Sequence, residues 1–518
     1  MPPSRTAPAS SRWAWFARRL AVVAAVIALA LVGWAWWGSV LPGTYSVMDM
    51  GSPDFGGGPG AAEHAASGHG AHAAAAAGEG AAVIGAAATV ATNVVDLAVD
   101  PDRPADVRVE LTARAERVTP AGGRPFDGFT LNGQSPGPTI RATQGQLVEV
   151  VLRNEDVPAG VTLHWHGVDV PNAMDGVAGV TQDAVPPGES FTYRFIAEQA
   201  GTFWYHSHQA SHPQVVGGLY GALILQPADA ASAADAIVAV HTYPGGQRTI
   251  NGATGEARQA AEPGAAVRVR LINTDSTPTS AWVTGSSFRM LAADGTDLNG
   301  PTSVDGRAVP LTAGGRADLE VTVPSAGAVR IQVPGASLVI GPDRAEASTS
   351  PAPREQVDLL SYGEPADAGF DAAQADRRFR YDIGRLPGFL DGAPGYWWTI
   401  NGGIVPAVPM YMVQEGDVVV MSISNNSGEV HPMHLHGHHL LVLSRDGVPS
   451  SGSPWWVDSL NVEHGETYEV AFVADNPGIW MDHCHNLPHA AEGLMTHLAY
   501  GGVTTPFRLG RDSGNDPE

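Results

Sequence analysis

The sequence predicts an all-β protein of three consecutive β-sandwich domains, preceded by one N-terminal transmembrane helix and a flexible tether. Three observations lead to this prediction. From about residue 91, short segments that alternate apolar and polar residues are separated by Gly, Pro and Asn turns, a pattern typical of β-sandwiches. One turn sequence then recurs three times, and an uncharged apolar run lies near the N-terminus.

The first 41 residues are expected to form an Arg-rich cytoplasmic start and a membrane anchor. The apolar run extends from Leu20 to Val40, which is long enough to cross a hydrocarbon core. Basic residues precede it and aromatic residues lie near its end (Arg5, Arg12, Arg18, Arg19; Trp34, Trp36, Trp37). This order favours a cytoplasmic N-terminus, with the Trp group at the outer interface. The catalytic domains would then lie on the extracytoplasmic side of the cell membrane.

A cleaved signal peptide, followed by secretion, is the alternative for this segment. Signal peptides have apolar cores of about 7–15 residues and an Ala-x-Ala-like cleavage site. No such site directly follows the run, so the sequence favours an uncleaved single-pass anchor.

Residues 42–90 are expected to form a flexible tether, because they are rich in Gly and Ala and poor in large apolar residues. The segment also contains soft and imidazole side chains that copper can bind (Met48, Met50, His64, His69, His72). The simpler interpretation is that these residues are incidental to a tether.

The bulk composition restricts the partners. The formal net charge of −24 argues against nucleic acid, whose binding requires Lys and Arg patches. The single cysteine, Cys484, excludes an intrachain disulfide.

An internal repeat divides the remaining chain into three domains. The sequences Thr-Leu-Asn-Gly at 130–133, Thr-Ile-Asn-Gly at 249–252 and Thr-Ile-Asn-Gly at 399–402 are versions of one turn. Each is followed by an alternating strand that ends at an Asn, 22, 22 and 24 residues after the turn Asn. Three copies of one domain are the economical explanation, with expected bounds of 91–228, 229–355 and 356–510 and a polar tail at 511–518.

A second repeat links only the first and third copies. His164-Trp165-His166-Gly167 is echoed by His434-Leu435-His436-Gly437, and His206-Ser207-His208 by His483-Cys484-His485. The middle copy contains no His-x-His sequence. A metal site is therefore predicted between the outer domains, with the middle domain as a spacer or substrate wall.

Ten of the nineteen histidines fall in four clusters, and one cluster flanks the only cysteine. Because successive side chains of a strand point to opposite faces, His483 and His485 would face one way and Cys484 the other. One covalent segment could then contact two metal sites. Imidazoles with one thiolate suit copper, and a set of two His and one Cys suits a blue-copper site.

The motifs His-Trp-His-Gly, His-Ser-His, His-Pro-Met-His-Leu-His-Gly and His-Cys-His-x-x-x-His resemble, in order and spacing, the copper motifs of the three-domain multicopper oxidases. The resemblance covers about residues 91–507. It implies cupredoxin-like Greek-key domains and four coppers per chain: one type 1, one type 2 and two type 3. It also implies that a reducing substrate gives electrons to the type 1 copper, near His489, and that O2 is reduced to water at the other three.

The resemblance also implies a ligand set for each copper. His431, Cys484 and His489 correspond to the type 1 ligands, and His164 and His434 to the type 2 ligands. The type 3 ligands would be two trios, His166, His206 and His485, and His208, His436 and His483.

Two positions qualify the resemblance. Five residues after His489, where many bacterial relatives have an axial Met, this chain has Leu494, which cannot coordinate. A raised type 1 potential is therefore expected, unless Met495 takes the axial place. Oxygen reduction also needs an acid. Asp175 matches an Asp near the type 2 copper of relatives, while the Glu that many relatives have after the last histidine is Ala490 here. Glu492 or Asp482 could replace it.

Two enzymatic functions remain open at this point. The favoured one is laccase-like oxidation of phenols or aromatic amines. The other is oxidation of Cu(I) for copper tolerance, which is disfavoured because the linker at 344–370 contains no Met. A non-enzymatic electron shuttle would need only the type 1 residues. The histidines outside the motifs (His212, His241, His438, His439, His464, His497) are expected to be surface or core residues, with His438 and His439 possible supports of the third motif.

Overall fold

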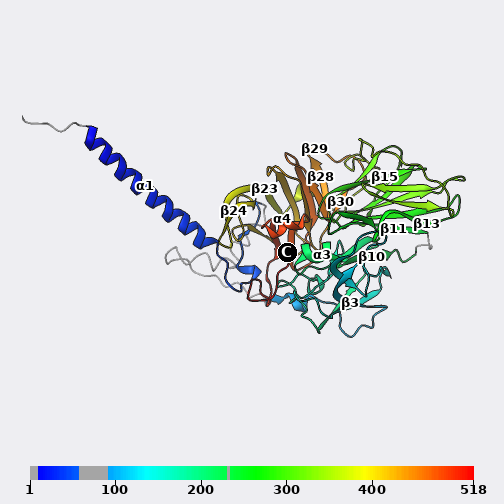
Figure 1. The fold of residues 1–518 in the computed structure, drawn as a ribbon, viewed down its shortest axis with the longest axis horizontal. Helices are drawn as coiled ribbons and strands as arrows, with labels where there is room; N and C mark the ends of the chain where they lie inside the picture. The colour runs from blue at the N-terminus through cyan, green and yellow to red at the C-terminus, as the bar shows by residue number, and fades with distance from the viewer. Residues whose placement is uncertain (1–9, 58–90, 230–233) are drawn as a thin grey trace, which may run out of the picture.

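The computed structural model describes residues 10–57, 91–229 and 234–518. A long helix, α1 (Ser10–Ser39), projects from one end of a globular body built of strands (Figure 1). The strands group into three successive sets, within residues 107–226, 235–341 and 377–504. The predicted all-β, three-domain fold is confirmed.

The first domain consists of two four-stranded sheets, β4-β3-β6-β8 and β5-β10-β9-β7. Its elements are β3 (Val107–Val118), β4 (Phe126–Leu131), β5 (Ile140–Thr143), β6 (Leu147–Asn154), β7 (His164–His166), β8 (Ser190–Ile196), β9 (Gly201–His206), α3 (Ser211–Gly217) and β10 (Tyr220–Gln226). Their inward side chains, including Trp165 and Phe195, form one buried core.

The middle domain forms one continuous 12-stranded sheet that folds around its own core. Its strands are β11 (Asp235–Tyr243), β12 (Gln247–Ile250), β13 (Ala253–Ala260), β14 (Ala266–Asn273), β15 (Thr279–Thr284), β16 (Phe288–Ala293), β17 (Thr296–Asp297), β18 (Ser303–Val304), β19 (Ala308–Leu311), β20 (Arg316–Thr322), β21 (Val329–Val333) and β22 (Ala336–Gly341).

The third domain packs a seven-stranded sheet, β24-β23-β26-β32-β28-β29 with β30 beside β28, against the six-stranded sheet β1-β25-β34-β33-β27-β31, whose first strand is β1 (Ser52–Asp54). Its elements are β23 (Arg377–Leu390), β24 (Ala393–Ile400), β25 (Pro409–Val413), β26 (Val418–Asn425), β27 (His431–Leu435), β28 (Leu440–Arg445), β29 (Val448–Pro449), β30 (Trp456–Val457), β31 (Ser459–Val462), β32 (Thr467–Val473), β33 (Ile479–Cys484), α4 (Leu487–Ala491) and β34 (Met495–Tyr500). A short parallel pair, β2 (Thr92–Asn93) and β35 (Val503–Thr504), ties the start of the first domain to the end of the third.

The repeated Asn-Gly turn has the same structure in all three domains. Asn132, Asn251 and Asn401 have φ of 56°, 52° and 51°, and each following Gly also has positive φ, as a tight turn with a left-handed backbone at both positions requires. Each Asn side chain accepts a hydrogen bond from one backbone N–H of the neighbouring strand and donates one to a carbonyl two residues earlier. The repeat read in the sequence is therefore one structural unit used three times.

Part of the expected tether is ordered, which corrects the prediction for residues 42–57. β1 (Ser52–Asp54) pairs in parallel with β25, Tyr45 bridges to Leu509, and Val47 and Met50 are buried in the third domain. The composition hid this docking because the few apolar residues of the segment are the ones that pack. Met50 is thereby buried and Met48 packs beside it, whereas His64, His69 and His72 lie outside the described residues.

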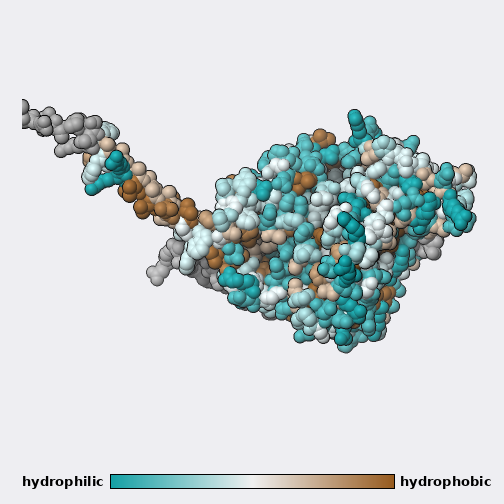
Figure 2. All heavy atoms as spheres, in the orientation of Figure 1, coloured by the Kyte–Doolittle hydropathy of each residue, from teal (hydrophilic) through white to brown (hydrophobic). Residues whose placement is uncertain are grey.

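Among the described residues, one helix is long and apolar enough to cross a membrane, over Trp13–Ser39. Its side chains are exposed except that of Ser39, where the last turn contacts the tip of the β23–β24 hairpin. Figure 2 shows the apolar surface of α1 ending where it meets the globular body.

Candidate metal centre

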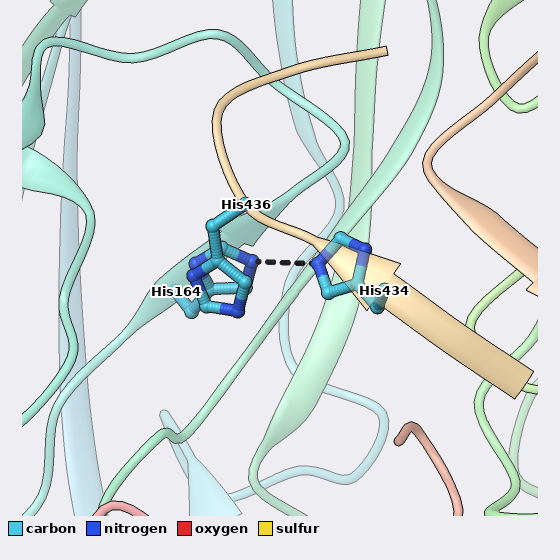
Figure 3. Close-up of side chains that lie close together, drawn as sticks. All are labelled: His164, His434 and His436. Carbon is cyan, nitrogen blue, oxygen red and sulfur yellow. Dashed lines mark hydrogen bonds between the residues drawn. The ribbon is translucent and has the colours of Figure 1, made fainter. Parts of the chain in front are cut away.

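The histidine motifs converge between the first and third domains because each lies on a strand at the facing edges. In the first domain β7 pairs with β9, which places His164 opposite His206. In the third, β27 pairs with β33, which places His434 opposite His483. Figure 3 shows His434 and His436 from the third domain meeting His164 from the first.

Eight histidines form one buried cluster, here called the eight-histidine cluster: His164, His166, His206, His208, His434, His436, His483 and His485. Nε2 of His164 lies 3.4 Å from Nε2 of His434, and Nε2 of His436 lies 3.2 Å from Nε2 of His483. Ligand atoms lie within 4.8 Å of one another in several trios, including His164/His166/His206 and His208/His436/His483. The ring of His485 lies 4.8 Å from that of His166, between centroids.

The second site contains the thiol. Sγ of Cys484 lies 3.6 Å from Nδ1 of His431 and 3.8 Å from Nδ1 of His489, and the two Nδ1 atoms are 3.1 Å apart. Cys484 faces the core of the third domain, while His483 and His485 face the eight-histidine cluster. The structure therefore agrees with one segment contacting two sites.

The outer nitrogens of several rings are held by acceptors, which fixes the direction of the inner nitrogens. Nδ1 of His164 lies 3.0 Å from the carbonyl of Asp175, and Nδ1 of His434 lies 2.8 Å from that of Asp458. The Asp175 carboxylate also contacts Nδ1 of His436, at 3.0 Å. The next residue, Gly176, has φ of +81° and packs so closely on the Leu163 backbone that a Cβ would not fit, so the turn that carries Asp175 requires glycine there.

Burial lowers the pKa of most of these rings, which favours the neutral form that metal ligands must have. The pKa falls to about 3 for His208, His485 and His431, and well below the usual value for five further rings (His166, His206, His434, His436, His483). Burial raises the pKa of the Cys484 thiol, so a thiolate there requires a bound cation.

The donor set fits copper. In the part of the chain that the structure describes, Nε2 of His206 and both ring nitrogens of His208 and His485 are buried without a hydrogen-bond partner, an arrangement that costs free energy unless a ligand fills it. Eight imidazoles in one cluster, beside a set of two His and one Cys, match the ligand preference of copper.

Leu494 is fully buried with Cys484 in the core of the third domain. The Cys484 N–H donates to its carbonyl at 3.0 Å. Met495, the next residue, lies on β34 opposite His483 of β33, and it lines a cavity of about 550 Å³. Leu494 thus lies in the same core as the thiol, and its place as the axial neighbour of a type 1 copper stays a prediction.

The two acids suggested as replacements at position 490 lie elsewhere. Glu492 accepts a hydrogen bond from Nε1 of Trp398, at 2.8 Å. Asp482 receives a hydrogen bond from the Tyr381 hydroxyl, at 3.4 Å, and burial raises its pKa to about 8. The carboxylate that does reach the eight-histidine cluster from this side is Glu518, with Oε1 at 3.1 Å from Nδ1 of His483.

Sequence reasoning missed Glu518 and the middle domain's contribution. The guanidinium of Arg316 on β20 is buried against the carboxylate of Asp458, with Nη1 2.6 Å from Oδ1. Oδ1 of Asp458 in turn lies 3.1 Å from Nε2 of His166. The middle domain is therefore more than a spacer or wall, because its Arg316 forms an ion pair with the Asp458 carboxylate, which contacts the eight-histidine cluster. No His-x-His pattern or spacing signals either residue.

His438 and His439 support the site. His438 is buried between the carbonyl of His436 and the hydroxyl of Tyr500, at 3.1 and 2.7 Å. His439 pairs with Asp169 at 3.3 Å and with Asp458 at 3.5 Å.

Comparisons with known proteins agree with this site. Two family models described as "Multicopper oxidase" match residues 112–230 and 386–501. The chain is 28% identical over 479 residues to the multicopper oxidase MmcO of Mycobacterium tuberculosis, covering 80% of this chain and 91% of the relative. It is 26% identical to Laccase-1 of Botryotinia fuckeliana, covering 71% of this chain and 77% of that relative. A multi-copper oxidase structure from Pseudomonas thermotolerans superimposes with a TM-score of 0.63 at 29% identity, covering 76% of this chain and 99% of that one.

The motifs, the buried donor set and these matches lead to one conclusion. The chain belongs to the multicopper oxidases, copper-dependent oxidoreductases that use O2 as the electron acceptor.

Proposed function

We propose that the chain holds four coppers and couples one-electron oxidation of phenols or aromatic amines to four-electron reduction of O2 to water. His431, Cys484 and His489 are assigned to the type 1 copper. His164 and His434 are assigned to type 2, and His166/His206/His485 and His208/His436/His483 to the two type 3 coppers. The converging Nε2 atoms of the eight-histidine cluster and the separate Cys484 set support this division.

Bound copper would supply the electron storage that a four-electron reduction of O2 requires. The residues of the chain do the rest. Cys484 is covalently continuous with His483 and His485, so the backbone itself joins the two sites. Asp175 holds a carboxylate between His164 and His436, and we propose it as the group that delivers protons to the reduced oxygen.

The observation that favours an organic donor is the environment of the outer edge of His489. Its Nε2 lies 3.1 Å from the Asn486 amide and 3.5 Å from the Glu429 carboxylate. Trp398 packs on the ring at 4.5 Å between centroids. Trp398 is buried and fixes the ring from behind, and the polar groups beside Nε2 suit a phenol whose hydroxyl points to that nitrogen.

Oxidation of Cu(I) is the rival function. Met48 and Met50, which Cu(I) could bind, are not displayed as free ligands, since Met50 is buried and Met48 packs against the third domain. An electron shuttle without O2 chemistry would leave the eight-histidine cluster unexplained.

We further propose that α1 is an uncleaved single-pass anchor, with the copper domains on the extracytoplasmic side. Hydrogen bonds from the last turn of the helix to the third domain support retention of the helix in the folded protein.

One comparison tests the function. Copper content and the visible and EPR spectra are measured first, and four coppers per chain with a thiolate-to-copper band are expected. Oxygen uptake is then followed with 2,6-dimethoxyphenol and with Cu(I) under identical conditions. Faster uptake with Cu(I) would replace the proposed substrate class, and a blue protein that consumes no O2 with either donor would make it a shuttle.

A further inference from the structure

The β23–β24 hairpin is longer than its counterparts in the other domains. From its base at Ile383 and Ile400 it runs through eight pairs to Leu390 and Ala393. The equivalent hairpins have six pairs in the first domain and four in the second. The extension therefore belongs only to the domain with the thiol site.

The extension is uncharged and apolar. Its outer five pairs consist of residues 386–390 and 393–397, Leu-Pro-Gly-Phe-Leu and Ala-Pro-Gly-Tyr-Trp. Leu386 is 46% exposed and Tyr396 is 55% exposed. In a chain of net charge −24, such an exposed apolar element marks an interaction surface.

The tip of the hairpin is joined to the end of α1. Nε1 of Trp36 donates to the Gly392 carbonyl at 3.1 Å, and Gly392 N–H donates to Ser39 Oγ at 3.2 Å. The Leu41 N–H donates to the Asp391 carboxylate at 2.9 Å. Figure 1 shows β23 and β24 beside the end of α1. Since a Trp near the end of a spanning helix lies at the membrane interface, the tip lies at the same depth.

One face of the extension leads from this tip to the thiol site. Residues paired across an antiparallel ribbon share a face, and alternate pairs share the same one. Phe389/Pro394, Pro387/Tyr396 and Arg385/Trp398 therefore form one row, here called the apolar row. It spans about 14 Å, at 3.4 Å per residue.

At its inner end the apolar row meets the type 1 ligands. Trp398 lies 4.5 Å from His489 and 4.7 Å from His431 between ring centroids. The guanidinium of Arg385 lies over the rings of Trp398 and Tyr396 and pairs with Glu429 at 3.0 Å. The row is thus apolar toward the helix and polar beside Nε2 of His489.

We infer that the apolar row lies on the lipid surface and guides a membrane-dissolved phenol or hydroquinone to His489. The apolar tail of the substrate would lie along Phe389, Pro394 and Tyr396, with its hydroxyl at Glu429 and Nε2 of His489. Two hydroquinones and one O2 give two quinones and two waters, so electrons and protons balance. This inference rests on the proposed oxidase function and on the proposed anchor.

The position of the row is tested in the copper-loaded full-length protein, reconstituted in phosphatidylcholine vesicles. Pro394→Cys is labelled with a fluorophore, which is selective because the native Cys484 is buried. Lipids brominated on their acyl chains should quench this probe. The control is Val448→Cys, an exposed apolar position on β29, distant from α1 in Figure 1. Equal quenching at both positions, or none at Pro394→Cys, would overturn the membrane contact.

The substrate class is tested with one hydroquinone head group, with and without a decyl chain. In vesicles, the ratio of kcat/KM for the decyl compound to that of the tailless compound should fall about tenfold in Phe389→Ser/Tyr396→Ser, because that row buries the tail. Val448→Ser should keep the parent ratio. The thiolate-to-copper band confirms that each variant is folded and loaded.

The outcomes separate the two levels of the proposal. If the unsubstituted protein oxidises neither hydroquinone, the oxidase function itself is contradicted. If it oxidises both, but the decyl-to-tailless ratio of kcat/KM is unchanged in Phe389→Ser/Tyr396→Ser, only the role of the apolar row is overturned.

Discussion

Oε1 of Glu518, the last residue of the chain, lies 3.1 Å from Nδ1 of His483. The tail is held in place by the Ser211 hydroxyl, which donates to the Pro517 carbonyl, and by paired backbone contacts of Asp516. The Glu518 carboxylate is buried and has no hydrogen bond among the described residues. Residues 516–518 therefore form part of the wall of the eight-histidine cluster, and they also line a cavity of about 550 Å³.

Deleting residues 516–518 should loosen this wall. We expect a fall in kcat of about tenfold or more, the usual effect of losing a group that supports a metal ligand. Copper should also be lost to a chelator from the cluster before the thiol site. Activity and band-resolved spectra measure both effects. Asp512→Asn, an exposed change in the same tail, is the control, and a deletion that behaves like it would show that the contact is incidental.

Glu518 also shows what a sequence can predict here. The ten motif histidines and Cys484 could be found from two patterns. Residues two apart on a strand point to the same face, so each His-x-His pair was expected on one face. Because the pairs recur in the first and third domains, those faces were expected to meet. Glu518, Arg316 and Asp458 could not be found, because each is a single residue that belongs to no repeat or alternating pattern. Their contacts, Arg316 with Asp458 and Glu518 with His483, exist only in the folded chain. The docking of residues 42–57 was missed for a related reason, since two buried side chains in a Gly-rich segment leave no periodic pattern.

Arg316→Met should destabilise the protein, although Arg316 belongs to the domain without copper motifs. Removing the guanidinium leaves the Asp458 carboxylate buried without its nearest ionic partner, and breaking such a buried pair typically costs about 3–5 kcal/mol. The thermal midpoint should fall and copper retention with it. Arg289→Met, which breaks the more exposed Arg289–Glu320 pair in the same domain, should change the midpoint little. Similar midpoints for the two variants would contradict a structural role for the Arg316–Asp458 pair.

Leu494→Met should lower the type 1 reduction potential. A thioether donor at this buried position favours the oxidised metal relative to leucine, and a tenfold change in the affinity ratio corresponds to about 59 mV for one electron. Redox titration of the thiolate-to-copper band gives the value. Met495→Leu should leave the potential unchanged, because Met495 lines the cavity of about 550 Å³. A potential that responds to Met495→Leu and not to Leu494→Met would reverse the assignment.

Asp175→Asn should slow O2 reduction while leaving the blue colour intact. The carboxylate contacts Nδ1 of His164 and of His436 but lies away from Cys484. Loss of a partner that supports metal ligands typically costs about 10–100-fold. Stopped-flow reoxidation of the reduced protein isolates this half-reaction from substrate oxidation. Asp183→Asn, in the same connecting region and bonded to Asn515, is the matched control. Unchanged reoxidation in Asp175→Asn would exclude the residue from proton delivery.

The charge on His439 predicts a pH dependence of stability. Burial alone would lower the pKa of His439, but the carboxylate of Asp169, with that of Asp458 nearby, outweighs burial and raises the pKa to about 9. A folded-state pKa above the unfolded value of about 6.5 means that the folded protein holds this proton more tightly. The resulting stabilisation is complete below about pH 6.5 and disappears as the pH rises through 9.

The thermal midpoint of His439→Gln should therefore lie several degrees below that of the parent at pH 6, and the two should converge near pH 10. Taking the difference between variant and parent at each pH cancels other titrations that the two proteins share. Asp169→Asn should shrink the same difference at pH 6, because it removes the carboxylate 3.3 Å from Nδ1 of His439. A gap between parent and His439→Gln that stays constant from pH 6 to pH 10 would mean that packing, rather than the charge on His439, accounts for its contribution.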